Sequence, residues 1–140
     1  MAVTSKKLEI GHKYPVFERE SGFATWNRYA AVNDEFVDIH MDDEAGRAAG
    51  YPSAFGMGNL TWAYFHVAIH WWLGDGVRIA RLAVQFRGAV TRGELLRVGG
   101  LVTGVQGNVV DLEMWADTER GAQLAPGSAT VELPAKPRTR

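Results

Sequence analysis

The sequence predicts an α+β domain in which an antiparallel sheet wraps around one long apolar helix. Two observations carry this prediction. The segment 55–74 contains no charged residue, and a helix that is hydrophobic on every side must be buried inside protein. The chain after it alternates apolar and polar residues with the period of two that is typical of half-buried strands. Each apolar surface needs a partner, so helix and sheet are expected to form one layered unit.

The elements before the long helix are short. Residues 14–19 predict a strand, and 23–32 predict a helix with its apolar residues on one side. Residues 34–41 show neither period and are expected to form an irregular loop. Residues 42–49 predict a short helix, because acidic side chains occupy its first turn and Gly50 stands at its end.

After a break at 74–76, alternation predicts the strands of an antiparallel meander. The expected strands are 82–87, 95–102, 110–117 and 129–133. Gly107 and Gly121 lie in segments whose composition is typical of hairpin turns. One sheet of this size covers only part of so apolar a helix, and we therefore expect a second subunit to bury the rest.

Composition excludes several classes of function. The chain has 140 residues, with 15 basic and 16 acidic side chains, so it has no strong field for nucleic acid. It has no cysteine, which excludes a disulfide framework, a thiol nucleophile and a cysteine-based zinc site. The segment 55–74 is long enough for a membrane span, but its polar residues, such as Asn59, would be costly in lipid, so burial within protein is favoured.

The sequence predicts one domain over residues 1–140, with 134–140 as a mobile polar tail. The N-terminal residues lack the apolar core of a secretory signal. A cytoplasmic location is the default expectation.

One stretch carries the parts of an acid–base site. Glu35 stands five residues before His40, and Gly56 stands where the apolar helix should begin. A carboxylate and an imidazole can activate water, and an N–H at the positive end of a helix can stabilise an anion. Glycine also lets a substrate approach the backbone closely. Asp34, next to Glu35, is an alternative carboxylate.

Some other side chains resemble metal ligands. His66 and His70 lie four residues apart on one helical face, but two imidazoles without a third ligand make a weak metal site, so packing is favoured. Asp42, Asp43 and Glu44 follow His40 closely. Capping of the short helix explains these three acidic residues better than a metal does.

Arginines and aromatic residues leave alternatives open. Three arginines fit contacts with the phosphate groups of a ligand as well as exposure to water: Arg78, Arg81 and Arg87. Five aromatic residues of the apolar segment are expected in the core and at an interface, with some available to line a ligand tunnel: Trp62, Tyr64, Phe65, Trp71 and Trp72.

Over residues 23–133 the chain resembles MaoC-type hydratases and dehydratases, which have the hotdog fold. These proteins carry the segment Y-A-x-x-S-G-D-x-N-P-I-H, and A-H-G-M at the head of the central helix. Here Tyr29-Ala30 and Ile39-His40 match the two ends of the first motif, and Ala54-Phe55-Gly56-Met57 stands at the second. Residues 82–90 and 93–98 resemble the strand, turn and strand that follow in the family.

The departures from the pattern concern the site itself. The family's aspartate falls on Glu35, its asparagine on Val37, its proline on Asp38 and its A-H-G-M histidine on Phe55. The extra methylene of glutamate moves the oxygens by more than ~1 Å, and an error of that size can cost about 10²-fold in rate. The version found here resembles a divergent branch whose members work as hetero-oligomers on bulky acyl-CoA side chains.

The resemblance implies hydration of a trans-2-enoyl thioester to an (R)-3-hydroxyacyl thioester, or the reverse dehydration. Glu35 and His40 would be catalytic, and Gly56 N–H would stabilise the enolate oxygen. No metal or redox cofactor is implied, and the acyl carrier would be CoA or an acyl carrier protein. The implied partners are this substrate and a second hotdog subunit, in a homodimer or a heterodimer, with neither nucleic acid nor membrane.

Two other functions remain open. A hotdog thioesterase usually places an acidic residue on or near the central helix, and 55–74 has none. A non-catalytic subunit of a hetero-oligomeric hydratase is favoured by the departures at Glu35 and Phe55.

Overall fold

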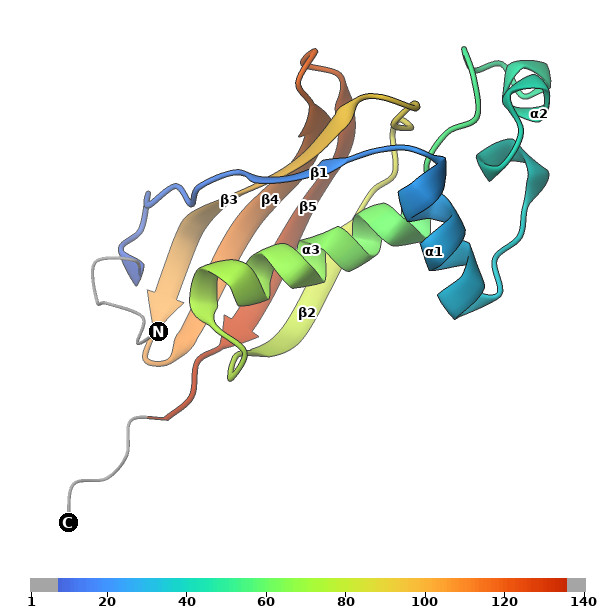
Figure 1. Ribbon diagram of the computed structural model, residues 1–140. Helices are drawn as coiled ribbons and strands as arrows, with labels where there is room; N and C mark the ends of the chain where they lie inside the picture. The colour runs from blue at the N-terminus through green and yellow to red at the C-terminus, as the bar shows by residue number, and fades with distance from the viewer. Residues whose placement is uncertain (1–7, 136–140) are drawn as a thin grey trace.

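The computed structural model describes residues 8–135 and consists of a curled five-stranded antiparallel sheet with one long helix against it (Figure 1). The elements follow in the order β1 (Phe17–Glu20), α1 (Phe23–Asn33), the 3₁₀ helix η2 (Asp38–His40), α2 (Asp43–Ala48), α3 (Gly58–Leu73), β2 (Arg78–Val84), β3 (Leu95–Gln106), β4 (Val109–Thr118) and β5 (Gln123–Glu132). The predicted α+β class, with a sheet around one apolar helix, is confirmed. The smaller helices gather beyond the N-terminal end of α3 (Figure 1).

The order of strands in the sheet is β1-β3-β4-β5-β2. The expected four-stranded meander is therefore wrong in part: β3, β4 and β5 form a meander, whereas β2 lies at the far edge beside β5. Alternation reports that a segment is a strand but not which strand it pairs with. The expected bounds were also too short, because β5 begins at Gln123 and continues through Pro126-Gly127, which interrupts the apolar pattern.

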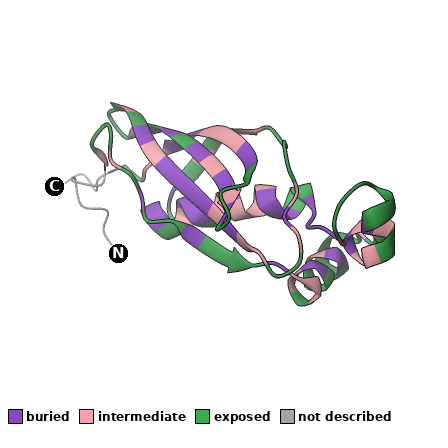
Figure 2. Cartoon of the chain, turned by 90° about the horizontal axis from the view of Figure 1, so that it is seen from above, coloured by how far each residue is buried: buried purple, intermediate pink, exposed green. Residues whose placement is uncertain are grey.

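The core lies between α3 and the sheet. Phe65, Ala68 and Ile69 of α3 are completely buried, as are Val98 and Val131 of the strands. Figure 2 shows the buried positions alternating with exposed ones along the strands, as the period of two requires. The expectation for the aromatic residues is confirmed for Phe65 and Trp72, which are buried in the core cluster.

The start of the long helix differs from the expectation. Helix α3 begins at Gly58 rather than at 55, because the chain before it is extended. Phe55 forms an isolated bridge with Thr91, and Gly56 N–H donates to Val90 O at 2.8 Å. The loop expected over 34–41 is also partly ordered, since it contains η2.

Within residues 8–135, no helix has the length and apolarity needed to cross a membrane. Residues 136–140 of the expected tail lie outside the described residues, while Pro134 and Ala135 belong to no helix or strand.

Candidate active site

The 3₁₀ helix η2 and the extended segment before α3 hold His40 in place. Its N–H donates to Val37 O at 3.0 Å, and the side chain is buried, with 8% of the residue exposed. The Nδ1 atom lies 2.7 Å from Phe55 O. A carbonyl oxygen only accepts hydrogen bonds, so Nδ1 carries the hydrogen, and in the neutral ring the lone pair is on Nε2. In this tautomer Nε2 is the nitrogen that can accept a proton.

Aromatic rings fix the imidazole further. The Phe55 ring lies edge-on to His40, with centroids 5.2 Å apart, and Tyr51 packs on Phe55 at 4.1 Å. Phe55 N–H donates to Ile39 O at 3.2 Å. Phe55, at the position where the resemblance leads us to expect a histidine, thus supports His40 through its backbone and its ring.

Glu35 approaches the N-terminal end of α3 from α1. Its N–H donates to Ala30 O at 3.0 Å, and its Oε2 accepts a long hydrogen bond of 3.5 Å from Asn59 Nδ2. Burial, and secondly the negative charge of Glu35, raise the pKa of Tyr29. Asp34 instead ends α1 in the left-handed conformation, with φ 54°, and is exposed. Of the two carboxylates, Glu35 is the one that faces α3.

The N-terminal end of α3 offers backbone donors. No side chain caps this end, and the N–H groups of Gly58 and Asn59 have no acceptor among residues 8–135. The first N–H groups of a helix point at its positive end and favour anions. The Gly56 N–H is different because it is already bonded to Val90 O.

Several of these groups line an open cavity of about 320 Å³. It is lined by His40, Tyr51, Phe55, Gly56, Gly58, Thr61, Phe86, Arg87, Gly88, Ala89 and Val90. The structure therefore brings His40 together with Gly56 and the start of α3. Glu35 is not among the lining residues and borders the same end of α3 through Asn59.

The residues that resemble metal ligands are engaged elsewhere. His66 Nδ1 lies 2.9 Å from Trp62 O, and His70 Nδ1 lies 3.2 Å from Gly74 O. In the part of the chain that the structure describes, no three His, Cys, Asp or Glu side chains converge. The capping prediction is confirmed for Asp42, which accepts from Glu44 N–H at 3.2 Å. Asp43 and Glu44 lie in the first turn of α2, and the Asp43 side chain also reaches Ala54 and Arg92.

The arginines separate in the structure. Arg78 pairs with Glu132 at 2.6 Å, far along the sheet edge, whereas Arg87 lines the cavity. Sequence reasoning missed Gly58, Phe86 and Arg92. Their roles depend on contacts between distant segments, and only the second glycine of Gly56-Met57-Gly58 was a local signal of close backbone approach.

Comparisons with known proteins bear on the family and on the fold. A model of the MaoC like domain matches residues 6–119. The R-hydratase PhaJ1 from Pseudomonas aeruginosa, in the unliganded form, has a TM-score of 0.87 at 22% identity over 96% of this chain and 88% of that chain. The (R)-hydratase from A. caviae involved in PHA biosynthesis gives 0.84 at 23% identity over 93% and 100%.

The ChsH1-ChsH2 complex from Mycobacterium tuberculosis gives a TM-score of 0.82 at 14% identity over 90% of this chain and 98% of that chain. No curated protein sequence matches this chain significantly. At these identities the structural likenesses show the fold, and the predicted hotdog fold is confirmed.

Proposed function

Because this chain belongs to the MaoC-like domain family, we propose that it hydrates trans-2-enoyl thioesters to (R)-3-hydroxyacyl thioesters, or catalyses the reverse dehydration. One observation carries the proposal: the buried His40 ring donates from Nδ1 to Phe55 O and lines the same cavity as the start of α3. A fixed base beside unpaired backbone donors is what addition of water to an enoyl thioester requires.

In the proposed reaction, His40 Nε2 removes a proton from water while the water oxygen bonds to the β-carbon. Glu35 accepts a hydrogen bond from the second O–H of that water and orients it, and this hydrogen stays on the oxygen as the new hydroxyl group. The electron pair of the double bond moves to the thioester oxygen as an enolate. The imidazolium of His40 then returns its proton to the α-carbon, and no metal or redox cofactor takes part.

The enolate oxygen needs a hydrogen-bond donor. The resemblance assigned this role to Gly56, whose N–H would have to exchange its bond to Val90 O for the substrate. Gly58 lines the same cavity, and its N–H has no acceptor to give up among residues 8–135. We therefore extend the proposed oxyanion site from Gly56 to Gly58.

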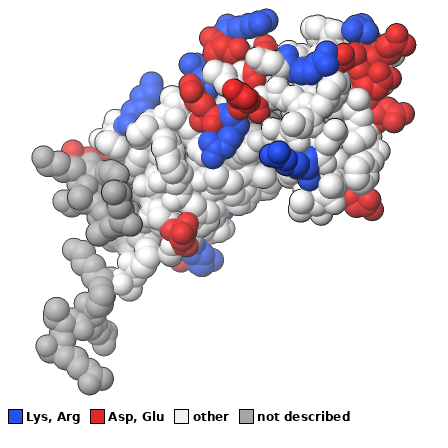
Figure 3. Space-filling view, in the orientation of Figure 1, with Lys and Arg blue, Asp and Glu red and all other residues white. Residues whose placement is uncertain are grey.

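The proposed acyl carrier is CoA or an acyl carrier protein, in the cytoplasm, and the proposed partner is a second hotdog subunit. Helix α3 leaves Val67 and Trp71 exposed, at 44% and 57%. Much of the molecular face over α3 is free of charged side chains (Figure 3). These features suit a homodimer or a heterodimer, because an apolar surface gains stability when a partner covers it.

A non-catalytic subunit of a hetero-oligomeric hydratase is the second candidate. It is favoured by one observation, that Glu35 does not line the cavity with His40. A thioesterase is less favoured, because α3 carries no carboxylate.

Hydration assays separate these candidates. The purified protein is mixed with crotonyl-CoA and with longer and bulkier enoyl-CoAs, and loss of the enoyl-thioester absorbance is followed. Glu35→Gln should lower kcat by about 10²-fold or more, whereas the matched variant Asp34→Asn should not. A folded protein that hydrates none of these substrates would support the subunit reading, and release of free CoA would support the thioesterase.

A further inference from the structure

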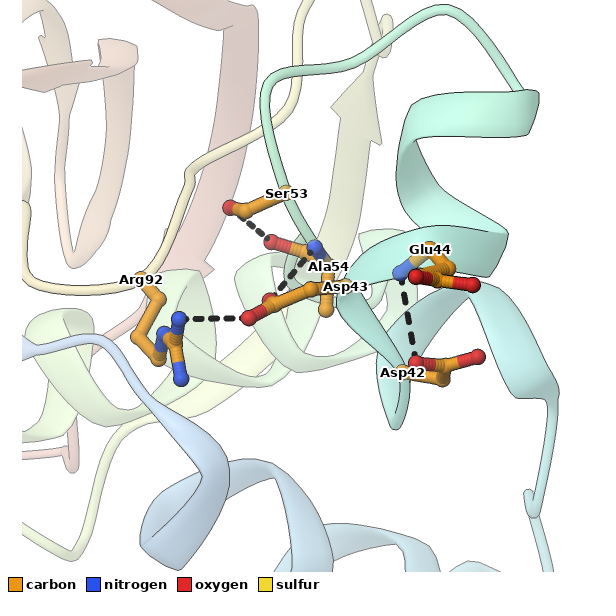
Figure 4. Close-up of polar contacts among 6 residues, drawn as sticks. All are labelled: Asp42, Asp43, Glu44, Ser53, Ala54 and Arg92. Atoms are coloured by element: carbon orange, nitrogen blue, oxygen red, sulfur yellow. Dashed lines mark hydrogen bonds and ion pairs between the residues drawn. The ribbon is translucent and has the colours of Figure 1, made fainter.

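We propose that Asp43 is a positioning residue for His40, which holds the imidazole and its backbone acceptor in register. Asp43 is the first residue of α2 and follows His40 by three residues. Figure 4 shows its carboxylate between Ala54, in the segment before α3, and the side chain of Arg92.

Both carboxylate oxygens of Asp43 are used, and by different segments. Oδ1 accepts from Ala54 N–H at 3.1 Å, and Oδ2 pairs with Arg92 Nη2 at 2.6 Å. The Asp43 side chain is partly buried, at 23% exposed, while Arg92 is 46% exposed. The Asp43 side chain therefore links three segments: α2, the extended segment before α3, and the loop between β2 and β3.

These bonds act on the site through the extended segment 54–56. Ala54, completely buried, is followed by Phe55, whose N–H donates to Ile39 O and whose carbonyl holds His40. A shift of Ala54 would move the acceptor of His40 Nδ1. Asp43 thus holds α2 against the extended segment at Ala54, while the His40–Phe55 hydrogen bond holds η2 against the same segment at Phe55.

The remaining contacts make Arg92 a firm anchor. Its guanidinium lies over the Phe23 ring at 4.8 Å, and the neighbouring Thr91 forms a bridge with Phe55. Thr91 N–H and Oγ1 both donate to Glu94 Oε2 at 2.8 Å. A Cβ on Gly46 would collide with the Ser53 carbonyl, so α2 packs closely against the segment before α3. Asp43 then determines where α2 lies along that segment.

The effect on catalysis rests on the proposed hydration, whereas the effect on the imidazole does not. Without Asp43 the protein should keep its fold, because α3 and the sheet hold the core. His40 should lose its single orientation, and Nδ1–H and Nε2–H forms should both become populated.

Four variants test this role. Asp43→Ala removes both bonds. Asp43→Asn keeps an oxygen for Ala54 N–H and removes the charge that pairs with Arg92, and Arg92→Gln removes the other partner. The matched control is Asp42→Ala, which removes a carboxylate from the same helix end that bonds only Glu44 N–H in the structure.

The first readout is the tautomer of His40 from side-chain ¹⁵N–¹H correlation spectra, with its signals assigned by their absence in His40→Gln. The chain has four histidines, so the spectra are simple. Wild type and Asp42→Ala should show the Nδ1–H form alone. Asp43→Ala should show averaged nitrogen shifts, and Asp43→Asn and Arg92→Gln smaller displacements. This readout needs no activity, so it tests the inference even if hydration is never observed.

The second readout is kinetic. Asp43→Ala should lower kcat by up to about 10²-fold with little change in KM, because a misplaced base affects the chemical step more than binding. A folded Asp43→Ala with the wild-type His40 spectrum would overturn the proposal. If Asp43→Ala fails to fold, Asp43→Asn and Arg92→Gln decide it by the same spectra.

Discussion

Two regions of this molecule are held together in different ways. Helix α3 and the strands form a core in which residues such as Phe65 and Val98 are completely buried. The site segment, residues 34–56, leaves Phe36 and Val37 at 59% and 44% exposed and is fixed by individual hydrogen bonds such as the one between His40 and Phe55. Apolar burial is non-directional and tolerant, whereas a hydrogen bond depends on the position of two atoms. Damage to the first region should therefore cost stability, and damage to the second should cost activity.

The largest stability effect is expected at Phe65, whose ring lies over Gly127 of β5. Phe65→Ala removes a completely buried ring and should lower the free energy of unfolding by about 3–5 kcal/mol. Urea denaturation followed by circular dichroism measures this change. An unchanged midpoint would contradict the assignment of Phe65 to the stabilising core.

A large effect on activity without loss of stability is expected at Gly58. Proline is well tolerated as the first residue of a helix, and Met57, with ψ 136°, already has the conformation that precedes proline. Gly58→Pro removes the proposed oxyanion donor and should lower kcat by about 10²–10³-fold. Gly58→Ala is the control, because it keeps the N–H and its Cβ would meet Phe86 at an ordinary 3.5 Å. Equal kcat values for the two variants would remove Gly58 from the site.

Gly56 lies where the two regions meet, and its substitution should affect both. A Cβ there would stand 2.7 Å from Val90 Cγ1 and 3.2 Å from Trp26 Nε1. Gly56→Ala should cost about 1–3 kcal/mol of stability through overpacking, and lower kcat in the fraction that remains folded. Thermal unfolding and the hydration assay measure the two effects. A Gly56→Ala variant as stable and active as wild type would show that the extended segment before α3 is not tightly fixed.

The smallest effect is expected at the exposed pair of Arg78 and Glu132. The hydrogen bond from Arg78 lowers the pKa of Glu132, so the pair stabilises the protein above the unfolded-state pKa, and this is lost as pH falls through the folded-state pKa. Solvent screens the pair. Arg78→Met should therefore leave the unfolding midpoint at neutral pH almost unchanged. A clear destabilisation at neutral pH, absent in acid, would show that this edge is more buried in solution, as in an oligomer.

The same contrast explains what the sequence could predict. Alternation and the uncharged segment identified α3 and the strands, because burial imposes a period on the residues. Alternation could not identify the strand that pairs with β2, because the choice of partner leaves no local pattern in the sequence. In the site, the spacing of Glu35 and His40 was visible, but the Phe55 carbonyl, the Gly58 N–H and the Asp43–Arg92 pair were not. Each depends on backbone geometry or on contacts across many residues of sequence.

The measurement that tests the central claim most directly is the hydration rate of His40→Ala beside wild type, on the best enoyl-CoA, with the folded fraction of each determined by circular dichroism. The His40 side chain forms a hydrogen bond with Phe55 O and an edge contact with the Phe55 ring, and both contacts lie within the site segment. We predict that His40→Ala folds and that its kcat falls by about 10²–10⁴-fold. A folded His40→Ala that hydrates the substrate as fast as wild type would contradict it.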